Sequence, residues 1–189
     1  MTPRLEPIEE PDEPEIQSAY RTMRQEFGTV PTPVKVVTAR MSESLEVNRM
    51  LQKFHEGIQL EPELKLVVGM FTSEINGCGF CVDLTQSEAI REDLDMEKFD
   101  ALTEYQASPL FSDRERAALA YAEEVTCQKN VSDATFEALC EHFDEQAIVE
   151  ITWLNAFQNY TNLVNIPLGI ESDGLRAIAQ SETQMEHEE

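Results

Sequence analysis

Apolar residues recur every three or four positions along most of the chain, which is the spacing of one face of an α-helix. The first clear run consists of Ile16, Ala19, Tyr20, Met23 and Phe27. Gly28 follows this run and is typical of the residue that ends a helix. The alternation of apolar and polar residues that marks a half-buried strand is nearly absent. The pattern predicts an all-α protein with about seven or eight helices.

Glycine and proline mark where most of the predicted helices begin and end. Residues 30–57 predict one long helix, with Pro33 in its first turn and Gly57 as its stop. Residues 61–75 predict a second helix, with Pro62 near its start and Asn76-Gly77 at its end. It is apolar on several faces, so we expect it to lie centrally. The next helix is expected from Cys78 to about residue 92.

The second half of the chain carries side chains suited to capping helix N-termini. Ser112 and Glu115 have the spacing of a capping box and predict a helix over residues 113–128. Ser132 or Asp133 is expected to cap the next helix, and Asp144 the last long one, which ends at residues 167–169. A short helix is expected over residues 95–105.

Both ends of the chain differ in composition from the rest. Residues 1–14 are acidic and contain four prolines, so we expect an extended arm that is poorly ordered unless a partner holds it. Residues 15–175 are expected to form one helical domain, and residues 176–189 a polar acidic tail. A chain of 189 residues with 41% hydrophobic residues is long enough to bury a sizeable core.

The charge balance narrows the range of partners. The 37 acidic and 14 basic residues give a formal net charge of −23. Nucleic acids and anionic membrane surfaces would be repelled by such a chain, so neither is expected as a partner. No apolar run reaches the roughly 18 residues of a membrane span, and the first residues lack a signal-peptide core. A cytoplasmic protein is expected, and cytoplasmic chains rarely use structural disulfides.

Cys78 and Cys81 form the clearest chemical motif, a C-x-x-C pair directly after Asn76-Gly77. In the first turn of a helix, free backbone N–H groups and the helix dipole favour a thiolate, and the short spacing allows a disulfide to close. Spacing alone leaves three interpretations open: a redox dithiol, half of a metal site, or packing.

The other cysteines and histidines offer little for a metal site. A zinc site needs four ligands. The remaining candidates are Cys127, Cys140 and His142, and both cysteines are expected to be buried as small hydrophobic residues. His55 ends a predicted helix and has no neighbour that suggests catalysis. No metal and no organic cofactor is expected from the residues.

Three stretches together resemble a known family: "LEPELKLVVGMFTSEINGCGFCVD", "FSDRERAALAYAEEVT" and "VSDATFEALCEHFDEQAIVEITWLNAFQNYTNLVNIPLGIESD". The chain is similar, over roughly residues 30–173, to the alkylhydroperoxidase D-like, carboxymuconolactone decarboxylase superfamily, and most to its peroxidase-related branch. The resemblance implies an all-helical fold and a homo-oligomer, a dimer, trimer or hexamer. It also implies that Cys81 attacks peroxide or a disulfide and that Cys78 resolves the product.

The chain departs from this family at the residues that activate the dithiol. The redox branch carries a Glu twelve residues before the first Cys and a His four residues after the second. Those positions hold Leu66 and Thr85 here. A thiol near its ordinary pKa of about 8.5 is mostly protonated at neutral pH, so the resemblance implies weakened catalysis.

Three nearby polar residues are possible auxiliaries. Glu74 and Asp83 would raise the pKa of a neighbouring thiol but could accept its proton. Thr85 could donate one hydrogen bond to the Cys81 thiolate. The alternative for both carboxylates is a solvated helix face.

Three functions remain open at this point. The first is a thiol-dependent oxidoreductase of peroxides or disulfides, which an external dithiol would reduce. The second is an oligomeric small-ligand-binding protein that has lost catalysis, since Leu66 makes the site more apolar. The third is lactone decarboxylation, which is disfavoured because the chain shows no basic cluster for an anionic substrate.

Overall fold

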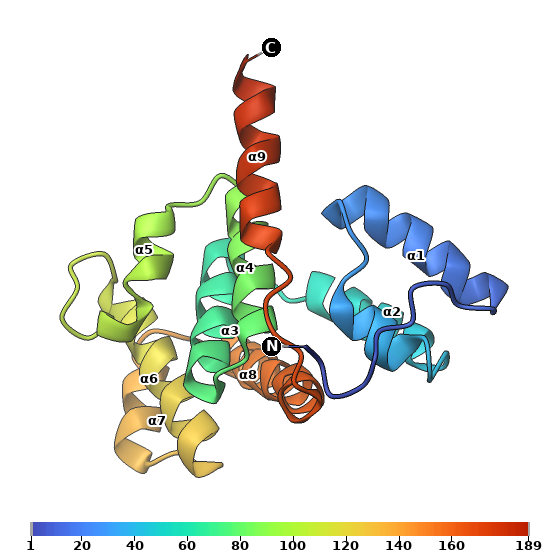
Figure 1. The fold of residues 1–189 in the computed structure, drawn as a ribbon. Coiled ribbons are helices and arrows are strands. Elements are labelled where there is room, and N and C mark those ends of the chain that lie inside the picture. Colours follow the sequence, from blue (N-terminus) through green and yellow to red (C-terminus); the bar gives the residue numbers. More distant parts are fainter. Residues whose placement is uncertain (1, 189) are drawn as a thin grey trace.

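The computed structural model describes residues 2–188 and confirms the all-α class (Figure 1). Its α-helices are α1 (Pro14–Phe27), α2 (Ser44–Glu56), α3 (Pro62–Asn76), α4 (Gly79–Arg91), α5 (Met96–Asp100), α6 (Asp113–Gln128), α7 (Asp133–Cys140), α8 (Glu145–Asn165) and α9 (Leu175–Glu188). The shorter segments are the π-helix η1 (Val34–Thr38) and the 3₁₀ helices η2 (Leu102–Glu104) and η3 (Ile166–Leu168). Within these residues no helix is long and apolar enough to cross a membrane.

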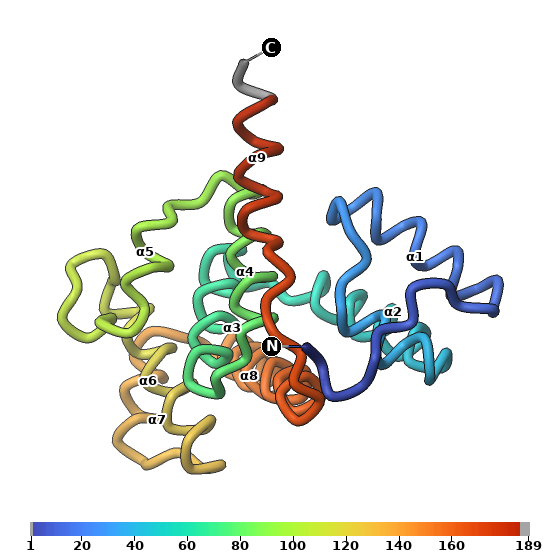
Figure 2. Tube along the Cα trace, in the orientation of Figure 1, coloured from blue at the N-terminus to red at the C-terminus, as the bar shows by residue number. Residues whose placement is uncertain are grey.

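Helix α3 is central, as its apolar composition predicts. It packs against α4, α6 and α8 (Figures 1 and 2). One face, through Leu64 and Val68, joins the core shared with α6, α7 and α8. Another, through Val67 and Met70, joins the core beneath α5 and η2. Helices α1 and α2 lie on the opposite side of the molecule from α5–α7 (Figure 1).

The predicted caps are present where the sequence placed them. Ser112 and Glu115 form the capping box of α6. The side chains of Ser132 and Asp144 accept backbone N–H groups at the starts of α7 and α8. Gly28 and Gly77 end α1 and α3 with φ of 71° and 72°, in the left-handed region that glycine adopts without a steric penalty.

The single long helix predicted over residues 30–57 is wrong. The chain forms η1, turns at residues 39–43, and begins α2 only at Ser44. The guanidinium of Arg40 explains the break, because it donates to the carbonyl of Val36 at 2.8 Å and to that of Glu6 at 2.7 Å. These bonds satisfy a carbonyl in the middle of η1 and link this segment to the N-terminal arm, a long-range contact that periodicity does not show.

The acidic arm lies along the chain's own surface. The N–H of Arg4 donates to the carbonyl of Leu168 at 2.8 Å, and the hydroxyl of Tyr20 donates to the carbonyl of Ile8 at 2.6 Å. The N–H of Ile8 also donates to the carbonyl of Lys35. The arm was expected to need a partner for order, and η1, η3 and α1 of the same chain provide these contacts.

The polar tail expected from residue 176 is instead part of a helix. α9 packs along α4 and extends beyond the other helices (Figure 1). Leu175 and Ala179 are fully buried, one helical turn apart. The apolar positions of this segment are few and its other residues are polar, so the sequence alone did not predict a helix. The helix is stabilised by its packing on α4.

Candidate functional site

The cysteine pair lies at the N-terminus of α4, as the sequence predicts. Cys78 is the N-cap residue, and Cys81 lies in the first turn. The left-handed backbone of Gly77 reverses the chain after α3, and the N–H of Cys78 then donates to the carbonyl of Ser73 at 2.9 Å. The two sulfurs form a disulfide, with the Cα atoms 5.4 Å apart.

The pair is covered by apolar side chains. Cys78 is 1% exposed and Cys81 4%. They belong to a core cluster with Val36, Phe80, Ile170 and Leu175. The same cluster joins η1, α4 and the start of α9, so these three segments enclose the disulfide.

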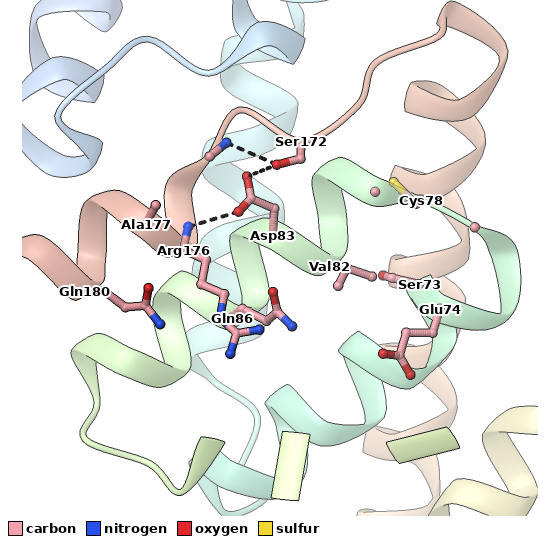
Figure 3. Close-up of a pocket in the computed structure, with 13 residues that line it drawn as sticks. Ser73, Glu74, Cys78, Val82, Asp83, Gln86, Ser172, Arg176, Ala177 and Gln180 are labelled. Carbon is pink, nitrogen blue, oxygen red and sulfur yellow. Dashed lines mark hydrogen bonds between the residues drawn. The ribbon is translucent and has the colours of Figure 1, made fainter. Parts of the chain in front are cut away.

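A pocket of about 550 Å³ lies beside the pair. Its wall includes Cys78 but not Cys81, together with residues of α3, α4 and α9: Ser73, Glu74, Val82, Gln86, Arg176, Ala177 and Gln180. In Figure 3, Glu74 and Cys78 lie toward one end of the pocket and Gln180 toward the other. A small molecule in this pocket would therefore contact one of the cysteine residues and several polar side chains.

Glu74 lies four residues before Cys78, and the structure places it in the same pocket wall. Its Oε2 is buried and has no hydrogen-bond partner among the described residues. Burial, and then the negative charge of Asp100, raise the pKa of the Glu74 carboxyl to about 7. A carboxyl with this pKa exchanges a proton near neutral pH, as a general acid or base must.

Asp83 has a structural task. It is 6% exposed, so the solvated-face alternative is wrong. Its Oδ2 accepts the hydroxyl of Ser172 and its Oδ1 accepts the N–H of Arg176, both at 2.9 Å (Figure 3). Oδ2 also accepts the N–H groups of Asp173 and Leu175, at 3.0 and 2.9 Å. Asp83 thus caps α9 from another helix and holds the loop that borders the pocket.

The two family relay positions carry no catalytic group. Leu66 is a partly buried side chain that packs against the core beneath α5. The Thr85 hydroxyl donates to the backbone carbonyl of Cys81 at 3.0 Å, so its hydrogen is directed to its own helix. Thr85 was expected to be able to donate to the Cys81 sulfur, and it bonds elsewhere.

The remaining candidates lie away from this pocket. Cys127 and Cys140 are exposed, so the expectation that both are buried is wrong. His142 is also exposed. His55 is absent from the pocket wall and lies near Phe157, with ring centroids 6.3 Å apart. In the described part of the chain, no three His, Cys, Asp or Glu side chains form a group that could hold a metal ion.

One residue beside the sulfurs was missed by the sequence interpretation. Asn165, the last residue of α8, is 5% exposed, and its Nδ2 lies 3.4 Å from Sγ of Cys81. A signal for it exists, because Asn155, Asn159, Asn162 and Asn165 are spaced by four, three and three residues. An asparagine row with helical period on a helix that also buries Ile151 and Leu154 indicates a polar contact inside the protein.

Comparison with known proteins identifies the family. The model of the carboxymuconolactone decarboxylase family matches residues 46–124. The uncharacterized protein YnjA of Escherichia coli K12 is 35% identical over 122 residues, which are 64% of this chain and 67% of YnjA. The chain belongs to the carboxymuconolactone decarboxylase family, within the AhpD-like superfamily.

Solved structures confirm the fold over nearly the whole chain. One is the alkylhydroperoxidase AhpD core, an uncharacterized peroxidase-related protein from Ralstonia eutropha JMP134: its TM-score is 0.73 at 23% identity, covering 94% of this chain and 96% of that one. Another is a variant of the debrominase Bmp8 in complex with 2,3,4-tribromopyrrole: its TM-score is 0.79 at 23% identity, covering 96% and 98%. The chain therefore shares its fold with an uncharacterized peroxidase-related protein and with a debrominase.

Proposed function

We propose that the protein is a thiol-dependent oxidoreductase in which Cys78 and Cys81 alternate between a dithiol and a disulfide. The observation that carries this proposal is the disulfide at the N-terminus of α4, beside a pocket that also contains Glu74. Membership of the AhpD-like superfamily supports it. Peroxides and disulfides are the proposed substrates.

The two cysteines together supply the two electrons that reduce a peroxide. The Cys81 thiolate attacks one oxygen of ROOH, the O–O bond breaks, and the alkoxide takes a proton and leaves as ROH. Cys78 then attacks the sulfenic acid, water leaves, and the disulfide closes. An external dithiol restores the reduced pair. The first turn of α4 favours the thiolate, because its first intrahelical bond runs from Val82 to Cys78 and leaves earlier N–H groups free.

Glu74 is proposed as the proton acceptor that the two relay positions no longer supply. It lines the pocket with Cys78, and its carboxyl exchanges a proton near neutral pH. Its negative charge when ionised would disfavour a nearby thiolate. The proposed role is therefore proton transfer, and catalysis is expected to be slower than with the relay Glu and His.

The test is turnover of hydrogen peroxide, an organic hydroperoxide and a small disulfide, with dithiothreitol or dihydrolipoamide as reductant. Wild type is expected to oxidise the dithiol, and Cys78→Ser and Cys81→Ser to lose more than about 10²-fold of the rate. Cys140→Ser is the matched control and should keep full activity, because Cys140 is exposed and away from the pair. A disulfide that no dithiol reduces, with thiols that no peroxide oxidises, would contradict the proposal.

Brominated aromatic compounds are a second proposed substrate class. The fold likeness to the debrominase Bmp8 and the pocket beside the pair favour this test. The balance is Ar–Br plus dithiol giving Ar–H, disulfide and HBr, so the same pair supplies two electrons. Bromide release from 2,3,4-tribromopyrrole measures it. Binding without any turnover would instead favour the ligand-binding alternative.

Lactone decarboxylation is not favoured by the pocket. The guanidinium in its wall, that of Arg176, already pairs with Asp100 at 3.1 and 3.3 Å. An anionic substrate would have to compete with this ion pair.

We also propose a homo-oligomer that covers an apolar strip on α2 and α8. The strip consists of large side chains that are 41–66% exposed: Val47, Met50, Phe54, Val149, Trp153, Tyr160 and Leu163. Phe54 and Trp153 join the two helices, with ring centroids 5.1 Å apart. The family resemblance, which implies an oligomer, supports a second copy of this chain as the occupant.

A further inference from the structure

The side chain of Asn165 reaches the cysteine pair from the C-terminal end of α8. Its Nδ2 donates toward Sγ of Cys81 at 3.4 Å, a separation that suits a hydrogen bond to sulfur. Asn165 is 5% exposed and Cys81 4%, so solvent does not compete strongly for either group. Asn165 is at neither of the family's relay positions, which hold Leu66 and Thr85.

A row of asparagine side chains along α8 holds this donor in place. Asn155 donates to Thr72 and Thr126, both at 2.9 Å. One turn further, Asn159 donates to the carbonyl of Asn155 at 2.9 Å. Asn162 continues the row toward the pair.

The row is also bonded to the end of α3. Asn76 donates to Oδ1 of Asn159 at 3.0 Å and to Oδ1 of Asn162 at 2.9 Å. Asn162 in turn donates to the hydroxyl of Ser73 at 3.2 Å. α8 is thereby fixed against the helix that leads into the pair, which sets the position of Asn165.

We propose that Asn165 is a catalytic residue of this site, a fixed hydrogen-bond donor that stabilises the thiolate of Cys81. The inference rests on the proposed redox function. It identifies a group that stabilises the thiolate in a site where the relay Glu and His are absent. A charged sulfur gains more from an N–H donor than a neutral thiol does, and the gain is larger where water is excluded.

The step in which this matters is reduction of the disulfide by a dithiol. The external thiolate attacks Sγ of Cys78, the residue in the pocket wall, and a new S–S bond forms. The bond between Cys78 and Cys81 breaks, and its electron pair leaves on Cys81. The charge then rests on the sulfur that faces Asn165 and the first turn of α4.

The neighbours of Cys81 leave few other causes for a shifted thiol pKa. The core cluster around the pair consists of apolar side chains from η1, α4, α9 and the segment after α8. The ionisable groups of the adjacent pocket wall are Cys78, Glu74, Asp83 and Arg176. The carboxylates of Glu74 and Asp83 would raise the pKa of a neighbouring thiol. A lowered pKa of Cys81 would therefore indicate a hydrogen-bond donor, the helix N-terminus or Arg176 as its cause.

The experiment measures the pKa of Cys81 from its alkylation rate against pH, with Cys78→Ser as the background. In this background the thiol is expected to titrate below its ordinary value. Asn165→Leu removes the donor at similar volume, and Asn165→Asp keeps the shape while replacing the donor with an acceptor. Both are expected to slow alkylation at pH 7 about tenfold, which corresponds to about one pKa unit.

A structural effect is separated by the control Thr152→Val, at a residue of α8 outside this row. The Thr152 hydroxyl lies 2.8 Å from that of Tyr121 and donates to the carbonyl of Ile148 at 2.7 Å, so the change should lower the melting temperature and leave the alkylation profile unchanged. In the protein with both cysteines, and at a pH above the pKa of Cys81, Asn165→Leu should shift the equilibrium with dithiothreitol toward the disulfide, and Thr152→Val should not.

Three outcomes would overturn the inference. One is an ordinary pKa of about 8.5 for Cys81 in the Cys78→Ser background. This measurement does not depend on whether any Asn165 variant folds. The others are an unchanged pKa in folded Asn165 variants and an equal shift in Thr152→Val. These results are independent of turnover: a shifted pKa without activity contradicts the proposed function alone, and activity without the shift contradicts only the role of Asn165.

Discussion

The Asp83 carboxylate on α4 caps the first turn of α9, with its Oδ1 2.9 Å from the backbone nitrogen of Arg176. Three further groups donate to its Oδ2, among them the N–H of Leu175 at 2.9 Å. A residue that the sequence offered as a proton acceptor is thus committed to holding a helix, and through it the wall of the pocket.

Replacing this cap should loosen α9. Asp83→Ala is expected to lower the free energy of unfolding by about 2 kcal/mol, because several buried N–H groups lose their acceptor. Chemical denaturation with circular dichroism measures it. Asp95→Ala is the control, since Asp95 is exposed and accepts one N–H at the start of α5, and a smaller loss is expected there. Equal losses in the two variants would contradict the special role of Asp83.

The pH profile of turnover should depend on Glu74. Its pKa of about 7 makes the carboxyl neutral below that pH and able to accept a proton above it. We expect the rate of wild type to rise as pH passes 7, and Glu74→Gln to lose this limb, with a rate at pH 8 lower by about 10²-fold. Glu104→Gln, at an exposed acid nearby, should keep the wild-type profile. A Gln variant with the same rising limb would place the base elsewhere.

The free energy of unfolding should decrease as pH rises, because of Glu88 on α4. Burial, and then the charges of Glu92 and Glu26, raise its pKa to about 7, opposed by Arg91. An acid whose pKa is raised on folding stabilises the protein below its unfolded value of about 4.5, and this contribution is lost as pH rises toward 7.

Glu88→Gln should therefore raise the melting temperature at pH 8 relative to wild type, and change it little at pH 4. Thermal unfolding at the two pH values measures the difference. Glu97→Gln, at an exposed site on α5, serves as the control and should show no such pH dependence. A Glu88 variant that is equally destabilised at both pH values would rule out the titration of this group as the cause.

The apolar strip on α2 and α8 makes the assembly state testable. Light scattering after size exclusion is expected to give a mass of two or more chains of 21.5 kDa. Trp153→Glu, in the middle of the strip, should shift the protein toward the monomer, because an interface would have to bury its charge. Phe136→Ser changes an exposed aromatic residue on α7 outside the strip and should have no effect. A wild-type monomer at all concentrations would exclude the proposed oligomer.

Local signals in the sequence were sufficient for most of the helices. The period of apolar residues gave the all-α class, and Ser112, Ser132 and Asp144 gave three helix starts that the structure confirms. Asn76-Gly77 before Cys78 gave the turn that puts the cysteine pair at a helix N-terminus. These features depend on neighbours within about four residues, and so the local sequence is enough to predict them.

The sequence by itself determined most of the helices, the C-x-x-C pair and the loss of both relay groups. The tertiary structure decided what surrounds that pair. Asn165 lies 84 residues from Cys81, and Arg176 lies 93 residues from Asp83, so no local pattern relates them. The break after η1 and the helix at the C-terminal end likewise depend on distant partners, Arg40 with Glu6 and α9 with α4. Hydrogen-bond donors and burial from such partners set the chemistry of a thiol, and only the folded chain brings them together.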